Sequence, residues 1–469
     1  MAEKKKTEGQ LLEEKLLAKN ESGFADFMKK NRKEIFAFGE DYKKFLGEVK
    51  TEREFTDEAV NMLEAAGFVA LKNGKKYKAG DRVYMNNHGK SLIAAIIGKK
   101  PIEQGANIVA AHVDNPRLDL KPNPLYEDNE LAYFKTHYYG GIKKYQWVTI
   151  PLALHGVVIK KGGENVKVNI GEDESDPVFV ISDILPHLSA HVQDDRKARE
   201  VIKGEELNVI IGSEPYDDSN VKEPVKLNVL RLLNEKYGIT EADFVSAELC
   251  AVPALKPRDL GLDRSLIGAY GHDDRSCAYV ELRAFIDFKG TPERTSICVL
   301  ADKEEIGSVG STGLESDMLV HFYSRLSGDV SLAMHNSKCL SCDVNAAIDP
   351  TFASAHETRN ASRLNHGPVL TKYTGARGKS STNDAHAEFM SEMRDMLDAA
   401  GVPWQTGELG KVDEGGGGTV ALYVSHYGVD TVDFGVALLS MHAPWEVASK
   451  IDLYSMYKSC LAFYAYKGR

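Results

Sequence analysis

The sequence contains few cysteines and no long apolar stretch. Six cysteines in 469 residues are typical of a protein with reduced thiols rather than of a disulfide-stabilised extracellular domain. Cys339 and Cys342 are a lone closely spaced pair without the further ligands of a metal or redox motif, and their role stays open. No apolar run reaches the ~18 residues of a membrane-spanning helix. The basic N-terminus is not followed by the apolar segment of a secretory signal. We therefore expect a cytoplasmic protein with no membrane partner.

The sequence also lacks an excess of basic residues. It has 58 Lys and Arg against 69 Asp and Glu, and its net charge is -11 at pH 7. Without a basic surplus to meet phosphates, a nucleic-acid partner is not expected. The glycine run at residues 415–418 lacks the Gly-Lys-Ser/Thr ending of a phosphate-binding loop. The length allows two or three domains.

The stretch at residues 295–313 is the most informative part of the chain. The apolar residues 297–301 have the length and β-branched character of a buried strand. Four charged residues follow, among them Glu304 and Glu305, and then three glycines in seven residues, which suit a tight turn. Ligands bind at the carboxyl ends of strands in open α/β sheets, and an unpaired buried charge is costly. Taken alone, this Glu pair would fit a solvated acidic turn better than a functional site.

Four other predicted buried strands also end at a side chain that can bind a metal ion. The strands are residues 107–111, 265–270, 330–334 and 431–439, and the ligands that follow them are His112, Asp273, Asp343 and His442. Glu305 completes the set. Mixed imidazole and carboxylate ligands suit zinc and similar divalent ions, and two such ions about 3.5–4 Å apart can share one bridging carboxylate. Any one of these residues alone would more often be structural, but together they predict a metal centre.

At these positions the sequence resembles the aspartyl aminopeptidase family, the eighteenth metallopeptidase family among the co-catalytic two-zinc exopeptidases, and it is similar to bacterial-type members. Two matching motifs are Asp-Lys-Glu-Glu-Ile-Gly-Ser (302–308) and Leu-Ser-Met-His-Ala-Pro-Trp-Glu (439–446). Further matches are residues 110–122, 247–254, 273–278, 341–347 and 365–372. The resemblance covers nearly the whole chain after about residue 20. It implies an aminopeptidase that removes N-terminal residues from short peptides, with the acidic residues Asp and Glu as the family's substrates.

The resemblance also implies how the metal ligands are shared. His112 and Asp343 would hold one divalent ion, Glu305 and His442 the other, and Asp273 would bridge them. One metal would polarise the scissile carbonyl, and one could hold the free α-amine. Zinc is expected, although cobalt and manganese tolerate the same ligands.

Two carboxylates are implied to act beside the metals. Glu304 would take a proton from the bridging water and deliver it to the leaving amine. Asp114 would hydrogen-bond the free ring nitrogen of His112 and so fix its tautomer.

The residues that resemble the family's substrate contacts leave specificity open. His191, in the loop at 185–193, looks like the histidine that reaches into a neighbouring subunit's site, but it could also be a loop residue without a catalytic role, and the role of His187 is open. Lys372 looks like the lysine that meets an acidic substrate side chain, although one extra residue shifts its register. Eukaryotic members carry two histidines within residues 346–350, where this chain has none and instead places Asp349, a poor neighbour for an acidic substrate.

Three functions therefore stay in view. The first is the aminopeptidase described above, and the second is a broad or neutral-residue aminopeptidase on the same site. The third is a non-catalytic assembly protein that keeps the fold. The intact Glu304 and complete ligand set disfavour this third reading.

The predicted fold class is α/β, a mixed and mostly parallel sheet flanked by helices as in zinc exopeptidases, with an inserted β-rich dimerisation domain. Residues 122–244 are rich in strands and separate His112 from Asp273. We therefore assign residues 1–121 and 245–469 to a catalytic domain split in sequence, and 122–244 to an inserted oligomerisation or lid domain. The resemblance implies a homo-oligomer, a tetrahedral dodecamer built from dimers that encloses its active sites.

Helices are predicted from apolar periodicity and end signals. Their ranges are residues 24–49, 56–66, 230–237, 275–287, 315–327, 384–400 and 451–466.

Overall fold

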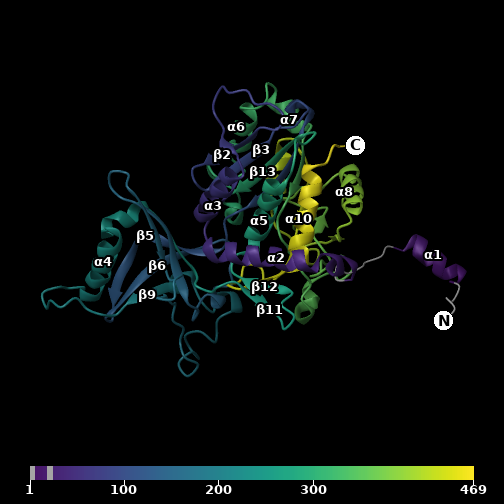
Figure 1. Ribbon diagram of the computed structural model, residues 1–469. Helices are drawn as coiled ribbons and strands as arrows, with labels where there is room; N and C mark the ends of the chain where they lie inside the picture. Colours follow the sequence, from purple (N-terminus) through teal and green to yellow (C-terminus); the bar gives the residue numbers. More distant parts are fainter. Residues whose placement is uncertain (1–5, 18–24, 469) are drawn as a thin grey trace.

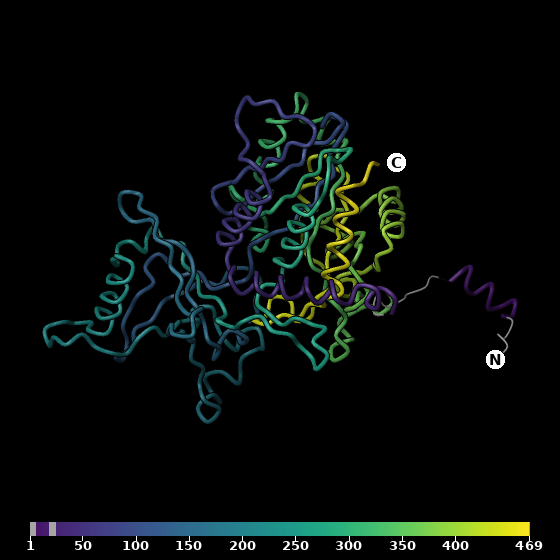
Figure 2. Tube along the Cα trace, in the orientation of Figure 1, coloured from purple at the N-terminus to yellow at the C-terminus, as the bar shows by residue number. Residues whose placement is uncertain are grey.

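The structure is a computed structural model that describes residues 6–17 and 25–468 (Figure 1). Residues 1–5, 18–24 and 469 of the predicted catalytic domain, and Phe24 of the predicted first long helix, lie outside the described residues. An α/β body lies beside a smaller lobe of strands, and the helix α1 (Glu8–Leu16) lies apart from both (Figures 1 and 2). Among the described helices, none combines the length and apolar content of a membrane crossing.

The body is built on a nine-stranded mixed sheet. Its strands, in spatial order, are β1 (Val69–Ala70), β2 (Arg82–Asn87), β3 (Ser91–Ile96), β13 (Thr295–Ala301), β4 (Ala106–His112), β14 (Lys338–Ser341), β18 (Asp430–Gly435), β16 (Val369–Thr371) and β17 (Gln405–Thr406). The central strands β13, β4, β14 and β18 run parallel, whereas β2–β3, β3–β13 and β16–β18 are antiparallel. The predicted mixed, mostly parallel sheet is thus confirmed.

Helices cover both faces of this sheet because its central strands are apolar on both sides. In β4, Val109 and Ala111 pack into one core, and Ile108 and Ala110 pack into the other. The first core holds α2 (Asp26–Glu48), α3 (Glu52–Ala65), α5 (His272–Asp287), α8 (Ala387–Ala400) and α10 (Lys450–Tyr464). The second holds α6 (Met318–Ser324), α7 (Val330–His335) and α9 (Val420–His426). Continuous burial of this kind is expected of parallel strands.

Several local predictions of element type or bounds were wrong. The predicted strand at 330–334 is the helix α7, because the Asp329 side chain accepts the backbone N–H of Leu332 and caps a helix there. The true strand is β14, eight residues later at its start. The predicted helix at 56–66 begins earlier, at Glu52, since Thr51 and Glu54 form a capping box.

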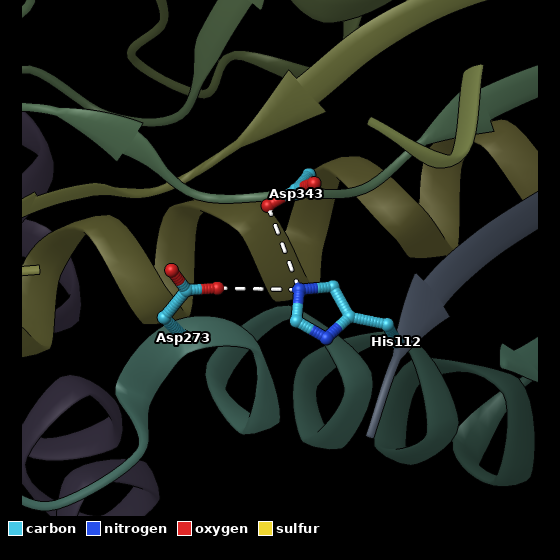
Figure 3. A group of neighbouring side chains, drawn as sticks. All are labelled: His112, Asp273 and Asp343. Atoms are coloured by element: carbon cyan, nitrogen blue, oxygen red, sulfur yellow. Dashed lines mark ion pairs between the residues drawn. The ribbon is translucent and has the colours of Figure 1, made fainter. Parts of the chain in front are cut away.

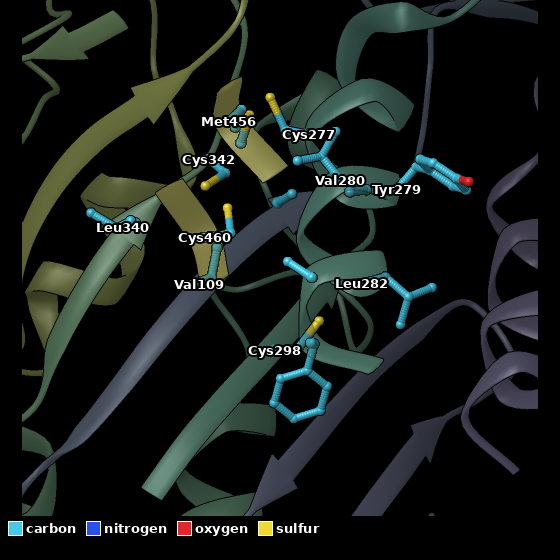
Figure 4. Packing of buried hydrophobic residues seen from close by; sticks show 14 of the residues in the cluster. Val109, Cys277, Tyr279, Val280, Leu282, Cys298, Leu340, Cys342, Met456 and Cys460 are labelled. Carbon is cyan, nitrogen blue, oxygen red and sulfur yellow. The ribbon is translucent and has the colours of Figure 1, made fainter. Parts of the chain in front are cut away.

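Cys339 and Cys342 lie on opposite sides of the central sheet. Cys339 packs into the core around α6 and α7, whereas Cys342 packs into the core around α5 and α10. Figure 4 shows Cys342 near Cys460 and Cys277 in this first core, with Cys298 farther away in the same core. All of these thiols are buried and none is in a disulfide, so the two sulfurs of the Cys339–Cys342 pair do not form a shared site.

A six-stranded antiparallel sheet forms the smaller lobe. In spatial order its strands are β8 (Asn165–Ile170), β7 (Leu152–Ile159), β10 (Ala247–Pro253), β5 (Arg117–Asp128), β6 (Leu131–Tyr139) and β9 (Asn208–Gly212). With α4 (Pro224–Tyr237) it encloses its own apolar core; this sheet and α4 are called the β lobe below. Strand β5 begins before residue 122 and β10 lies after residue 244, so the sheet extends beyond the predicted 122–244 segment at both ends.

A third, five-stranded sheet links the other two regions. Its order is β11 (Arg258–Leu260), β12 (Leu266–Ala269), β20 (Glu446–Ser449), β19 (Ala437–Leu439) and β15 (Asn345–Ala346). The predicted single strand at 431–439 is therefore two strands, β18 in the central sheet and β19 in this one. The chain passes close to Asp343 at Gly435, where any Cβ would collide with the Asp343 backbone oxygen.

Candidate metal centre

The five predicted ligands converge from two different sheets. His112 ends β4, Asp343 follows β14, and Glu305 lies in the short helical turn Glu304–Ile306 after β13. These three strands are neighbours in the central sheet, so their carboxyl ends place the three side chains together. Asp273 lies at the start of α5 after β12, and His442 follows β19, both strands belonging to the third sheet.

The ligand atoms form two groups that share Asp273. One group is His112, Asp273 and Asp343, and the other is Asp273, Glu305 and His442; within each, the ligand atoms lie within 4.8 Å of one another. Asp273 Oδ1 is 3.2 Å from His112 Nε2, and its Oδ2 is 3.1 Å from His442 Nε2. Figure 3 shows Asp273 and Asp343 converging on the His112 ring, with Asp343 Oδ1 3.8 Å from Nε2. Each oxygen of Asp273 therefore faces a different group.

Both histidines present the same ring nitrogen to the cluster. Nδ1 of His112 donates to the Asp114 backbone oxygen at 3.0 Å and is 3.3 Å from Asp114 Oδ1. Nδ1 of His442 donates to the Gly141 backbone oxygen at 2.6 Å. A carbonyl can only accept, so Nδ1 carries a proton in each ring, and Nε2 is the nitrogen left to bind a metal ion.

Asp114 also organises the turn that carries the two glutamates. Its buried carboxylate accepts the backbone N–H of Glu304 at 3.1 Å and that of Glu305 at 3.2 Å. It receives a third hydrogen bond, of 2.8 Å, from the Tyr139 hydroxyl. The turn needs left-handed backbone at Lys303 and Gly307, which the glycine accommodates without strain.

The pKa values of the site residues are shifted because several carboxyl groups lie close together in a buried place. Burial, with the nearby Asp114 and Asp273 carboxylates, raises the pKa of Glu304 to about 7. Burial and the Asp273 charge raise the pKa of Glu305 well above its ordinary value. Burial alone would lower the pKa of His442, but the hydrogen bond and charge of Asp273 raise it to about 10. The carboxylates thus repel one another, and each gains from a nearby cation.

The residues present fit divalent metal ions. Oε1 of Glu305 is buried and accepts no hydrogen bond from any described residue, an arrangement that leaves a lone pair for an ion. The donor set of two imidazoles and three carboxylates is that of zinc and similar metals. Nε2 of each histidine faces Asp273 and is the ring nitrogen that an ion would bind.

Glu446 is a site residue that the sequence reasoning gave no role. Its buried carboxyl accepts the backbone N–H of Asp273 at 3.1 Å and that of His442 at 2.7 Å, so it ties together two ligands from distant segments. Burial, with the Asp273 charge, raises its pKa to about 8. Its only sequence signal was its place at the end of the motif at 439–446.

Lys372 and His191 lie outside both ligand groups. Lys372 follows β16, which runs antiparallel to β18, and its ammonium pairs with Asp384, which also pairs with Lys379. His191 is exposed in the loop at 185–193. The Asp349 side chain accepts the backbone N–H of Thr351 at 2.8 Å and caps the turn Pro350–Ala355.

A mixed α/β sheet that collects histidines and carboxylates at the ends of its strands is the architecture of a metal-dependent hydrolase. The family model described as aminopeptidase I zinc metalloprotease (M18) matches residues 45–464. The chain belongs to this M18 family of zinc metalloprotease aminopeptidases.

The relatives agree along nearly the full length. The chain is 49% identical over 460 residues to a probable M18 family aminopeptidase 1 from Clostridium acetobutylicum, covering 96% of this chain and 98% of the relative. A crystal structure of an M18 family aminopeptidase from Thermotoga maritima superposes with a TM-score of 0.91 at 44% identity, covering 96% of this chain and 99% of the other. The S. cerevisiae mApe1 dodecamer has the same fold, with a TM-score of 0.73 at 21% identity over 91% of this chain and 96% of its own.

Proposed function

We propose that this M18 aminopeptidase hydrolyses N-terminal residues of peptides with two divalent metal ions per subunit, and that Glu304 is its general base. The observation that carries this proposal is the pair of ligand groups that share Asp273. His112 and Asp343 would hold one ion, Glu305 and His442 the other, and Asp273 both. Zinc ions bound there would polarise the scissile carbonyl and make a water molecule more acidic.

Glu304 would move the proton in this proposal. Its carboxyl is beside the cluster, with Oε2 3.8 Å from His112 Nε2, yet it belongs to neither ligand group. A carboxylate beside the metal centre can accept a proton from a metal-activated water and return it to the leaving amine. The hydrogen bond from its backbone N–H to Asp114 holds it in place.

We propose a broad or neutral preference for the N-terminal residue over a strictly acidic one. Lys372 is the residue that would meet an acidic side chain, and its charge is already paired with Asp384. An acidic substrate would have to displace this carboxylate, whereas a neutral one would not. Lys372 is half-exposed, so Asp384 and a substrate carboxylate would compete for its ammonium in contact with water. An ion pair contributes little there, so Lys372 would give an acidic substrate little advantage.

A panel of aminoacyl p-nitroanilides tests both parts of the proposal. The zinc-loaded enzyme should hydrolyse alanyl and leucyl substrates at least as well as aspartyl and glutamyl ones, and metal analysis should find two equivalents of zinc. Glu304→Gln should hold the same zinc without turnover. An enzyme with its full zinc content that hydrolyses none of these substrates would contradict the peptidase role, and hydrolysis confined to acidic residues would contradict the proposed preference.

We also propose that the chain forms a homo-oligomer through the loop at 185–193, which connects strands β8 and β9 of the β lobe. The loop at 185–193 exposes three large apolar side chains, Leu185, Leu188 and Val192, of which Leu188 is 63% exposed. Apolar side chains gathered on one projecting loop are more often covered by a partner than left in water. His191 lies between them, so a partner that covers the loop would also receive this histidine.

Light scattering and activity together test the assembly. Leu188→Asp should dissociate the oligomer and lower turnover, and His191→Ala should lower turnover with unchanged zinc content. Leu262→Asp, at an exposed leucine outside the β lobe, is the matched control and should leave both unchanged. A fully active monomer would contradict the proposal.

A further inference from the structure

We propose that the segment Tyr139-Gly140-Gly141, at the end of β6, is a positioning element through which the β lobe sets the affinity of the metal centre. The proposal rests on the two-metal site described above. It assigns a function to three residues that are neither ligands nor the proposed base. Each of the three successive residues makes one contact with the site, and together these contacts reach both ligand groups.

Gly141 fixes the ring of His442. Its backbone oxygen accepts the Nδ1 proton of His442 at 2.6 Å, although 301 residues separate the two in the chain. Because this carbonyl holds a proton on Nδ1, Nε2, which lies 3.1 Å from Asp273 Oδ2, is the ring nitrogen that would bind an ion. A displaced Gly141 would free the ring to rotate and to change tautomer.

Gly140 brings the chain against Glu305. Its backbone is left-handed, with φ of 72°, and a Cβ at this position would lie 2.9 Å from Glu305 Oε2. Only glycine combines this conformation with this approach. The backbone of Gly140 therefore forms one wall of the space available to the Glu305 carboxylate.

Tyr139 hydrogen-bonds the Asp114 carboxylate, which also accepts the two glutamate N–H groups. Its hydroxyl donates to Asp114 Oδ2 at 2.8 Å, and Asp114 in turn contacts His112 and the backbone of both glutamates. This hydrogen bond joins Tyr139 to the first ligand group and to the turn that carries Glu304. The ring is buried, so water cannot replace the hydroxyl without repacking.

The β lobe determines where this segment lies. Tyr139 is the register partner of Arg117 in the β5–β6 pair, and the Arg117 guanidinium stacks over its ring at 4.0 Å. Arg117 also donates to Glu52 of α3 at 3.0 Å and to Asp119 at 2.7 Å. Arg117 is only 9% exposed, so this pairing is well shielded from water. It anchors the end of β6 to the α/β body at a fixed distance from the ligands.

Two substitutions test the segment, with zinc affinity measured by chelator competition as the main readout. Tyr139→Phe removes only the hydroxyl, and Gly140→Ala places a methyl group against Glu305. Each should weaken zinc binding by about tenfold to a hundredfold, the usual effect of losing a partner that orients a ligand. The thermal midpoint of the zinc-free protein should change little for Tyr139→Phe, which a merely structural role would not predict.

Matched controls separate the contacts from general effects. Tyr138→Phe alters the neighbouring tyrosine, which is 38% exposed. Gly163→Ala imposes the same backbone penalty at a glycine with φ of 90° and open space around it. Both should bind zinc like the unmodified enzyme.

The outcomes distinguish this proposal from the one on which it rests. If Asp273→Ala abolishes zinc binding while Tyr139→Phe and Gly140→Ala retain the unmodified affinity, the positioning role is overturned and the metal site stands. If Asp273→Ala binds zinc normally, the metal site itself is wrong. Should Gly140→Ala fail to fold, Tyr139→Phe decides the question alone.

Discussion

The carboxylate of Asp114 accepts the backbone N–H of Glu304 across a separation of 190 residues. Asp114 follows β4 and Glu304 follows β13, and these are neighbouring parallel strands. The contact therefore lies directly beyond the sheet edge, where the chain turns away from each strand. It fixes the proposed base by its main chain and leaves its carboxyl free to exchange a proton.

Glu304→Gln should abolish turnover while zinc binding persists. The amide has the shape of the carboxyl but cannot accept and return a proton, and a general base contributes about a hundredfold to ten-thousandfold to rate. Steady-state kinetics with metal analysis of the same preparation checks this. Near-native turnover in the variant would remove Glu304 from the mechanism.

Asp273→Ala should weaken the binding of both metal ions, because each oxygen of Asp273 faces one ligand group. Mass-spectrometric metal analysis after dialysis against a weak chelator would measure the remaining equivalents. Asp349→Ala is the control, since it removes a carboxylate that only caps a turn and should retain both ions. Two tightly held equivalents in Asp273→Ala would rule out the bridging role.

Asp384→Asn should shift substrate preference towards acidic residues. The change releases Lys372 from its ion pair, so the ammonium can meet a substrate carboxylate. The gain in kcat/KM for glutamyl over alanyl substrates should be about fivefold or less, because exposed ion pairs contribute at most about 1 kcal/mol. Lys372→Met, as the opposite change, should reduce the same ratio. An unchanged ratio in both variants would show that Lys372 does not meet the substrate.

His155 should stabilise the attachment of the β lobe below neutral pH. Its Nδ1 is 2.8 Å from Glu54 of α3, and its Nε2 is 3.1 Å from Glu172. Burial alone would lower the pKa of His155, but these two carboxylates raise it above 6.5. The stabilisation from the charged ring is therefore complete below about pH 6.5, the unfolded value, and is lost as the pH rises through the folded value.

The corresponding test compares the unmodified protein with His155→Gln by thermal unfolding at several pH values. The difference in Tm should be largest near pH 6 and should shrink as the pH rises and the His155 ring of the unmodified protein loses its charge. A difference that is constant with pH would show that packing, and not charge, is what His155 contributes.

Local chemistry made much of the site predictable. Continuous apolar residues predict buried strands such as β4 and β13. A charged or imidazole side chain directly after such a strand is therefore a candidate metal ligand. Short apolar runs are ambiguous, which is why 330–334 was predicted as a strand. There, the capping hydrogen bond of Asp329 decided for a helix.

The sequence by itself determined which residues stand at the ends of the core strands, because strand burial and ligand chemistry are properties of short segments. Only the tertiary structure decided that His442 and Asp273 reach the centre from a separate sheet, that Glu446 joins their backbones, and that Gly141 orients a histidine. These contacts link segments up to 301 residues apart. No local sequence pattern predicts these contacts, because they depend on how three sheets pack together. The contact of Gly141 is also made by a backbone carbonyl, which every residue has and which the sequence therefore cannot single out.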